Sequence, residues 1–143
     1  MRYPDSYGAR IGLRMLAGLL LGAVAWYPVG RLLFDGTAGL LGPAGRGLPE
    51  IVRFLVMASL GFEAAALLAI IALVVMGRSG GSVVGAVLGM LVPGLGLAGI
   101  ALALPPDQTT GIVALVSPVV ACFCSTLGAA WREVVPSRES VPS

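Results

Sequence analysis

The sequence contains no histidine, lysine or asparagine, and charged residues make up only 11% of its 143 positions. Without histidine, the chain lacks the commonest metal and haem ligand and the usual proton carrier at neutral pH. Catalytic sets of the Ser/His/Asp or Cys/His kind are therefore excluded. The nine arginines are spread along the chain, and a net charge of +2 gives no basic patch for nucleic acid. We expect no catalytic residues, no metal site, no cofactor and no nucleic-acid partner.

Cysteine is also scarce, with two residues that lie close together in an apolar run. Cys122 and Cys124 are two positions apart, so on a helix they point about 200° away from each other and cannot form a disulfide. We interpret them as small packing residues. An intramembrane redox protein that uses Cys122 or Cys124 is the weakest of the functional alternatives.

Apolar residues are what the sequence has in excess. They make up 57% of the chain, and the mean hydropathy is +0.97. A soluble domain of this size cannot bury so much apolar surface. Four runs reach the roughly 20 residues that cross a bilayer, at positions 15–34, 51–76, 82–104 and 111–131. The sequence predicts an all-α integral membrane protein, a single transmembrane domain built as a four-helix bundle, with polar tails at 1–14 and 132–143.

The segments between the runs are short and rich in glycine and proline. Residues 35–50 are expected to form a loop, and 77–81 a tight turn that makes the second and third helices antiparallel. Within the third run, the sequence Pro93-Gly94-Leu95-Gly96 predicts an interruption of the helix. The first run also fits a signal peptide ending at Ala23-Val24-Ala25, but the bulky Trp26 after that site favours a retained helix.

Arginine placement predicts the orientation. With both termini cytoplasmic, six arginines lie inside and three outside, as the positive-inside rule favours. The inside set is Arg2, Arg10, Arg14, Arg78, Arg132 and Arg138, and the outside set is Arg31, Arg46 and Arg53. The Ala/Gly/Arg-rich composition is typical of a GC-rich bacterial genome, so we expect a multi-pass protein of the bacterial inner membrane.

Small residues recur every four positions in the predicted helices. In lipid, helices associate by close packing, and such faces mark where backbones approach. The packing residues that we predict are Gly81, Gly85 and Gly89 in the third helix and Gly61, Ala65 and Ala69 in the second.

Glu63 is the one ionisable residue deep inside a predicted span. An acid there costs a few kcal/mol on insertion scales, so it usually faces protein or water and marks a site. Ser59 shares its helix face, whereas Gly61 and Ala65 lie roughly opposite. Counted from Ser79, Glu63 lies level with the proline–glycine segment, and a count from the turn near Asp107 brings residues 120–122 to the same depth.

A carboxyl beside interrupted backbone resembles the general layout of transporter sites. The predicted ion, proton or substrate site therefore comprises Glu63, Ser59, Gly89, whose carbonyl Pro93 frees, and Pro93, Gly94 and Gly96. The opposing interpretation is a protonated, hydrogen-bonded Glu63 inside a passive bundle. The sequence favours neither.

Three functional hypotheses follow. The leading one is a non-enzymatic accessory or structural subunit, with the bilayer and other membrane subunits, or further copies of the chain, as partners. The second is a small proton- or cation-coupled transporter or channel that uses Glu63. The third is the redox protein named above.

Overall fold

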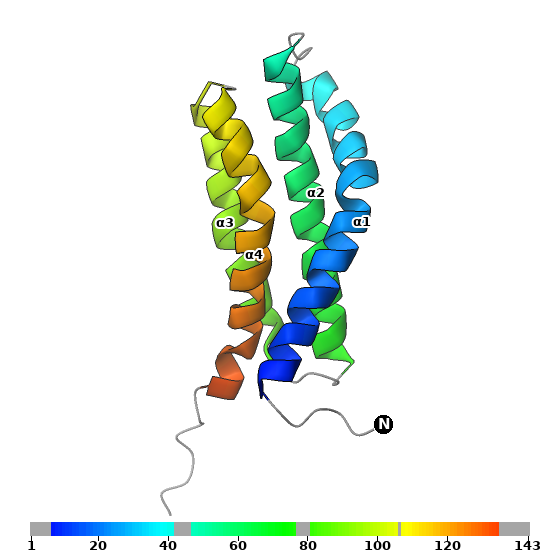
Figure 1. The fold of residues 1–143 in the computed structure, drawn as a ribbon, viewed down its shortest axis with the longest axis vertical. Coiled ribbons are helices and arrows are strands. Elements are labelled where there is room, and N and C mark those ends of the chain that lie inside the picture. The colour runs from blue at the N-terminus through cyan, green and yellow to red at the C-terminus, as the bar shows by residue number, and fades with distance from the viewer. Residues whose placement is uncertain (1–6, 42–46, 77–80, 106, 135–143) are drawn as a thin grey trace, which may run out of the picture.

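The computed structural model describes residues 7–41, 47–76, 81–105 and 107–134, and these form four α-helices (Figure 1). They are α1 (Tyr7–Leu41), α2 (Leu48–Val75), α3 (Val83–Ala103) and α4 (Gln108–Val134). Each is long and apolar enough to cross a membrane, which confirms the prediction of four apolar helices.

The helices form two antiparallel hairpins, α1 with α2 and α3 with α4 (Figure 1). Helix α2 packs closely against all three others, and α4 also approaches α1, whereas the backbones of α1 and α3 do not come close within their described parts. The start of α1 and the end of α4 lie at the same end of the bundle (Figure 1). Helix α2 is thus the element on which the hairpins meet.

Helix α1 is longer than the sequence predicted at both ends. It begins at Tyr7, inside the expected polar tail, and continues to Leu41, inside the expected loop at 35–50. At about 1.5 Å per residue, its 35 residues extend about 50 Å, well beyond the hydrocarbon core. Two local contacts support the additional turns, an Arg31–Asp35 ion pair at 3.2 Å and a hydrogen bond from the Thr37 hydroxyl to the Phe34 carbonyl at 3.1 Å.

Helix α3 is continuous, so the predicted interruption at Pro93–Gly96 is wrong. Pro93 and Gly94 both lie within helix. A proline in a helix removes its own N–H bond, but the rest of the ladder still forms, and neighbouring helices in a membrane bundle tolerate the local defect. The backbone around Glu63 is therefore helical on all sides.

Close glycine contacts join α3 to α4. A methyl group added at Gly85 would collide with the carbonyl of Gly128, and one added at Gly128 would collide with the carbonyl of Gly85. At the start of α3, Gly81 has φ +114°, a conformation suited to glycine, and the Ser82 amide donates to the Ala129 carbonyl at 2.8 Å. The Ser125 hydroxyl adds a bond to the Ala86 carbonyl at 2.9 Å. The two backbones are in direct contact as a result.

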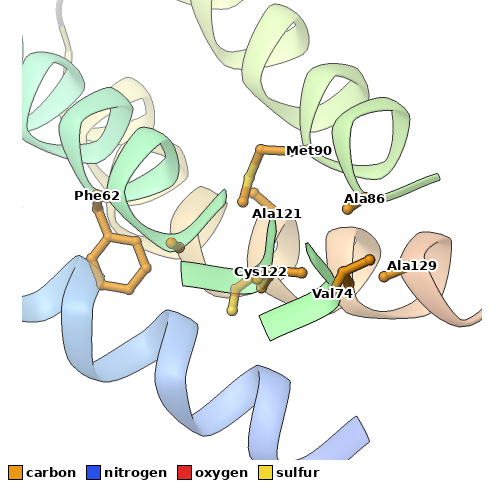
Figure 2. Packing of buried hydrophobic residues seen from close by; sticks show 9 residues of the cluster. Phe62, Val74, Ala86, Met90, Ala121, Cys122 and Ala129 are labelled. Carbon is orange, nitrogen blue, oxygen red and sulfur yellow. The ribbon is translucent and has the colours of Figure 1, made fainter. Parts of the chain in front are cut away.

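The core is made mainly of small side chains. Figure 2 shows Met90 of α3 directed toward Ala121 of α4, and Phe62 of α2 lying over α1. Glycines admit the larger groups: a methyl at Gly22 would lie 2.6 Å from the Phe62 ring, and one at Gly18 would lie 2.8 Å from the Cys122 sulfur. This core therefore depends on the absence of side chains at defined positions of α1.

Helix α4 begins with an aspartate cap. The Asp107 carboxylate accepts bonds from the Thr110 amide at 2.9 Å and the Thr110 hydroxyl at 3.0 Å. These two bonds favour the charged carboxylate, and they lower the pKa of Asp107 below its ordinary value. The cap fixes where the α3–α4 connection ends, and so it sets which α4 residues lie level with Glu63.

Candidate functional site

Glu63 is buried at the junction of α2, α3 and α4, with only 3% of its surface exposed. The Ser117 hydroxyl of α4 donates a hydrogen bond to Glu63 Oε1 at 2.7 Å. A serine hydroxyl can donate to either the charged or the neutral form of a carboxyl. The acid is therefore directed toward a polar group of the protein, as is expected of an acid within a helix that could cross a membrane.

Gly94 of α3 provides the space for the other carboxyl oxygen. A methyl group at position 94 would lie 2.8 Å from Glu63 Oε2, so any larger residue would displace the acid. Pro93 next to it is half-buried. The structure therefore brings together Glu63, Ser117 and Gly94, one residue from each of three helices.

Ser59 completes this polar layer one helical turn away on α2. Its hydroxyl is fully buried and donates to the carbonyl of Ala114 on α4. That carbonyl would normally accept from the amide of residue 118, but residue 118 is Pro118 and has no N–H. Ser59 thus satisfies a backbone acceptor that the proline of α4 leaves open.

Two of the other predicted site residues lie away from Glu63. Gly89 packs against the Cys124 carbonyl of α4, so it belongs to the α3–α4 contact. Gly96 is exposed, and a methyl group added there would meet nothing within 4 Å. With α3 continuous, the residues of this segment point in several directions, and of its two glycines Gly94 faces the acid and Gly96 does not.

The four predicted packing glycines lie in two interfaces. Gly81, Gly85 and Gly89 all face the backbone of α4. Gly61 contacts Val29 and Gly30 of α1. On the same helix Ala65 is buried and Ala69 half-buried.

An open, apolar groove lies beside the acid, between α3 and α4. Its volume is about 400 Å³, and its lining includes Pro93, Leu97, Val113, Val116 and Ser117. Ser117 is the residue that links the groove to Glu63, because it lines the one and hydrogen-bonds the other. The carboxyl therefore lies one side chain away from an open surface of the bundle.

Ser117 was missed because the position level with Glu63 on α4 was placed at residues 120–122. Gly94 lies nine residues before Ala103, the end of α3, and Ser117 lies nine residues after Gln108, the start of α4. Counting from the helix ends therefore identifies Ser117. The sequence prediction of residues 120–122 assumes a turn centred near Asp107, whereas the midpoint between the end of α3 and the start of α4 is near Pro105.

Besides Glu63, Arg14 is the other charged side chain that is deeply buried among the described residues, whereas the sequence predicts it in the polar tail. Its side chain is fully buried, and a methyl group at Gly81 would lie 3.0 Å from its Nη2. The Cys122 thiol of α4 contacts the carbonyl of Met15, the next residue along α1, at 3.8 Å. The difference arises because α1 begins at Tyr7, so Arg14 is part of the helix and lies within the bundle.

The remaining polar groups do not assemble into a metal or catalytic cluster within the described ranges. No three His, Cys, Asp or Glu side chains come together there. Both cysteines are free thiols, Cys122 buried and Cys124 half-buried. Comparison of the chain with protein-family models, curated proteins and solved structures finds no match.

Proposed function

We propose that this protein is a non-enzymatic structural subunit of a membrane assembly, formed with other membrane proteins or with further copies of itself. Its place is the bilayer, as a multi-pass protein of the bacterial inner membrane with both termini in the cytoplasm. The arginine distribution supports this orientation, and the common position of the first and last helix ends is compatible with it.

The observation that carries the proposal is the enclosure of Glu63. Its carboxyl is buried, accepts from Ser117 of α4 and fits over Gly94 of α3. Together with Ser59 and Ala114, it forms an interhelical hydrogen-bonded layer that holds α2 against α4. The hydrogen bonds that join the helices can offset the free-energy cost of inserting an acid into the membrane, so no transported ion is needed to explain Glu63.

The outward surface of α3 provides the second support. Long apolar side chains are exposed along it, namely Val84, Leu88, Leu91, Val92 and Leu95. Lipid or a neighbouring membrane helix is a suitable environment for such a surface. A subunit presents surfaces of this kind to its assembly.

The test combines assembly with flux. The chain is purified alone in mild detergent, its mass is measured against the 14.5 kDa of one copy, and it is reconstituted into liposomes. A structural subunit forms a defined oligomer, or a stable complex of fixed stoichiometry when partners are co-expressed. In liposomes that contain such a subunit, an imposed proton gradient decays at the same rate as in protein-free vesicles. A monodisperse monomer that dissipates the gradient contradicts the proposal.

A proton- or cation-coupled transporter or channel is the second candidate, and one observation favours it. Ser117 contacts Glu63 and also lines the open groove between α3 and α4, so a rotation of one serine side chain would open the acid to the groove. On this hypothesis, gradient-driven flux in liposomes is abolished in Glu63→Gln and retained in Asp35→Asn, a control that removes an exposed acid.

The redox alternative rests on Cys122 and Cys124, which lie in different environments. Cys122 is buried against α1 near Gly18, whereas the Cys124 backbone faces Gly89 of α3. If either thiol has a redox role, Cys122→Ser or Cys124→Ser should abolish the redox activity. The structural proposal instead predicts that both variants still assemble.

A further inference from the structure

The groove between α3 and α4 is apolar except at one point. Its volume is about 400 Å³, and among its described lining residues Ser117 alone has a polar side chain. From Pro93 to Ile100 the groove follows α3 for about 10 Å, at about 1.5 Å per residue. On the other side it reaches Ile112, in the first turns of α4. The groove therefore runs from the depth of Glu63 toward the α3–α4 connection, and it has room for a compact apolar body.

Ser117 keeps hydrogen-bonding capacity after its bond to Glu63. Its hydroxyl proton is donated to Glu63 Oε1 at 2.7 Å, and a hydroxyl oxygen can also accept hydrogen bonds. Hydrogen bonds that form a chain strengthen one another, so a hydroxyl that donates to a carboxyl is a better acceptor. Ser117 is half-buried and lines the groove, so it is the place where a donor in the groove would bind.

Glu63 gives this place a preference for positive charge. Its carboxyl is buried and is bonded by Ser117, and no arginine belongs to the described lining of the groove. In a medium of low dielectric constant, a carboxylate attracts a nearby cation more strongly than it does in water. A paired cation also offsets the cost of a charged carboxylate in apolar surroundings. A ligand with both a positive charge and an N–H donor would use both residues.

We propose that the groove binds a compact lipophilic primary amine in its ammonium form. The apolar body of the ligand lies against Leu97, Val113 and Val116. One N–H of the ammonium donates to the hydroxyl oxygen of Ser117, which itself donates to the Glu63 carboxylate. Apolar walls with a few placed polar groups are typical of small-molecule sites. The proposal concerns binding alone, so it is independent of whether the protein is a structural subunit or a transporter.

Three adamantane derivatives separate charge from hydrogen bonding. Adamantylammonium has the charge and the N–H donors, its trimethyl derivative has the charge without a donor, and adamantanol has a donor without the charge. Each is dialysed to equilibrium against phosphatidylcholine nanodiscs that contain the protein, and empty nanodiscs measure the partition into lipid. The excess is the ligand bound by the protein. We expect adamantylammonium to bind about ten times more tightly than either of the other two.

Gly96→Leu tests the groove without changing the polar pair. Gly96 lines the groove, and an added methyl group there would meet nothing within 4 Å, so a leucine side chain can fill the groove while α3 stays in place. We expect this variant to lose the excess binding of adamantylammonium. Gly99→Leu is the matched control, because Gly99 is equally open but lies outside the described lining of the groove. It should bind the ligand as the original protein does.

Glu63→Gln and Ser117→Ala test the polar pair. Glutamine keeps an oxygen for the Ser117 hydroxyl but removes the charge, so it should weaken adamantylammonium binding about tenfold and leave adamantanol binding unchanged. Alanine removes the acceptor, so it should abolish the advantage of adamantylammonium over its trimethyl derivative. Circular dichroism and the mass in detergent establish that each variant keeps its helices and its oligomeric state.

Three results would overturn the proposal. One is the absence of any binding above that of empty nanodiscs. Another is equal binding by the Gly96→Leu and Gly99→Leu proteins, which would place the ligand outside the groove. The third is equal affinity of the three derivatives for the original protein, which would show that neither Ser117 nor Glu63 takes part. Loss of binding by an intact oligomer leaves the structural proposal standing, whereas binding by a monomer leaves this one standing.

Discussion

Ser59 of α2 hydrogen-bonds the Ala114 carbonyl of α4, the acceptor that Pro118 leaves without its helical N–H. The serine on one helix and the proline on another are thus linked through a single backbone oxygen. Removing the Ser59 hydroxyl should leave the Ala114 carbonyl without a donor. Replacing Pro118 by a residue with an N–H should provide that donor and make the hydroxyl dispensable.

We expect Ser59→Ala to destabilise the bundle by about 0.6 to 1.7 kcal/mol, the range of interhelical hydrogen bonds in membranes. In a Pro118→Ala background, the amide of residue 118 can bond Ala114, so the same substitution should cost much less. Unfolding titrations in mixed detergent micelles give the four free energies of the cycle. Equal costs in the two backgrounds would show that Ser59 and Pro118 are independent.

Glu63→Gln and Glu63→Leu separate hydrogen bonding from volume at the acid. Glutamine keeps an oxygen for the Ser117 hydroxyl, so we expect a change below about 1 kcal/mol. Leucine leaves that hydroxyl without its acceptor in a buried place and should cost about 1–3 kcal/mol. The same micelle titration measures both. A glutamine variant as unstable as the leucine variant would contradict the role of the acid as a hydrogen-bonding group.

Gly85→Ala should be strongly disruptive, because its methyl group would meet the Gly128 carbonyl across the α3–α4 contact. Overpacking of this kind costs about 1–3 kcal/mol. Gly96→Ala on the same helix is the matched control, since nothing lies within 4 Å of the added methyl. Yield of folded protein and resistance to detergent unfolding are the readouts. Similar behaviour of the two variants would mean that α3 does not approach α4 at Gly85.

The cap of α4 predicts a pH dependence with a defined sign. The pKa of Asp107 is lowered by its two bonds from Thr110, so its stabilisation is complete above the ordinary aspartate pKa of about 3.9. It is lost as the pH falls from there through the lowered value, because the folded state then has to take up the proton. Asp107→Asn keeps a capping oxygen and should remove this part of the acid loss in melting curves. An identical acid profile in both proteins would exclude the carboxylate as the source.

Topology can be tested with single cysteines in a chain whose two native cysteines are replaced by serine. With both termini inside, an impermeant thiol reagent added to intact cells should label cysteine at positions 45 and 108 and spare positions 6 and 79. Permeabilised cells provide the control for reactivity at all four positions. Labelling at position 79 would reverse the orientation.

The apolar runs by themselves were enough to predict four helices, because each is long enough to cross a bilayer and helix is the form in which a chain satisfies its own backbone in lipid. Their ends were harder to predict. Asp35, Gly36 and Thr37 are typical of a loop, yet α1 includes them, supported by the Arg31–Asp35 pair. Glycine and aspartate favoured a loop there, whereas the i,i+4 spacing of Arg31 and Asp35 favours helix, and the structure follows the second signal.

The sequence did not determine the depth of each residue along its helix or the direction in which its side chain points. The composition of the second run identified Glu63, since an acid inside an apolar helix is visible without any structure. Only the tertiary structure decided that Ser117 bonds it, that Gly94 makes room for it, and that Gly96 faces away. A shift of three residues in one connection moves a different side chain to the acid, because successive helical residues point about 100° apart. Partners across helices therefore depend on where each helix begins, which here the Asp107 cap and the glycine contacts of α3 and α4 determine.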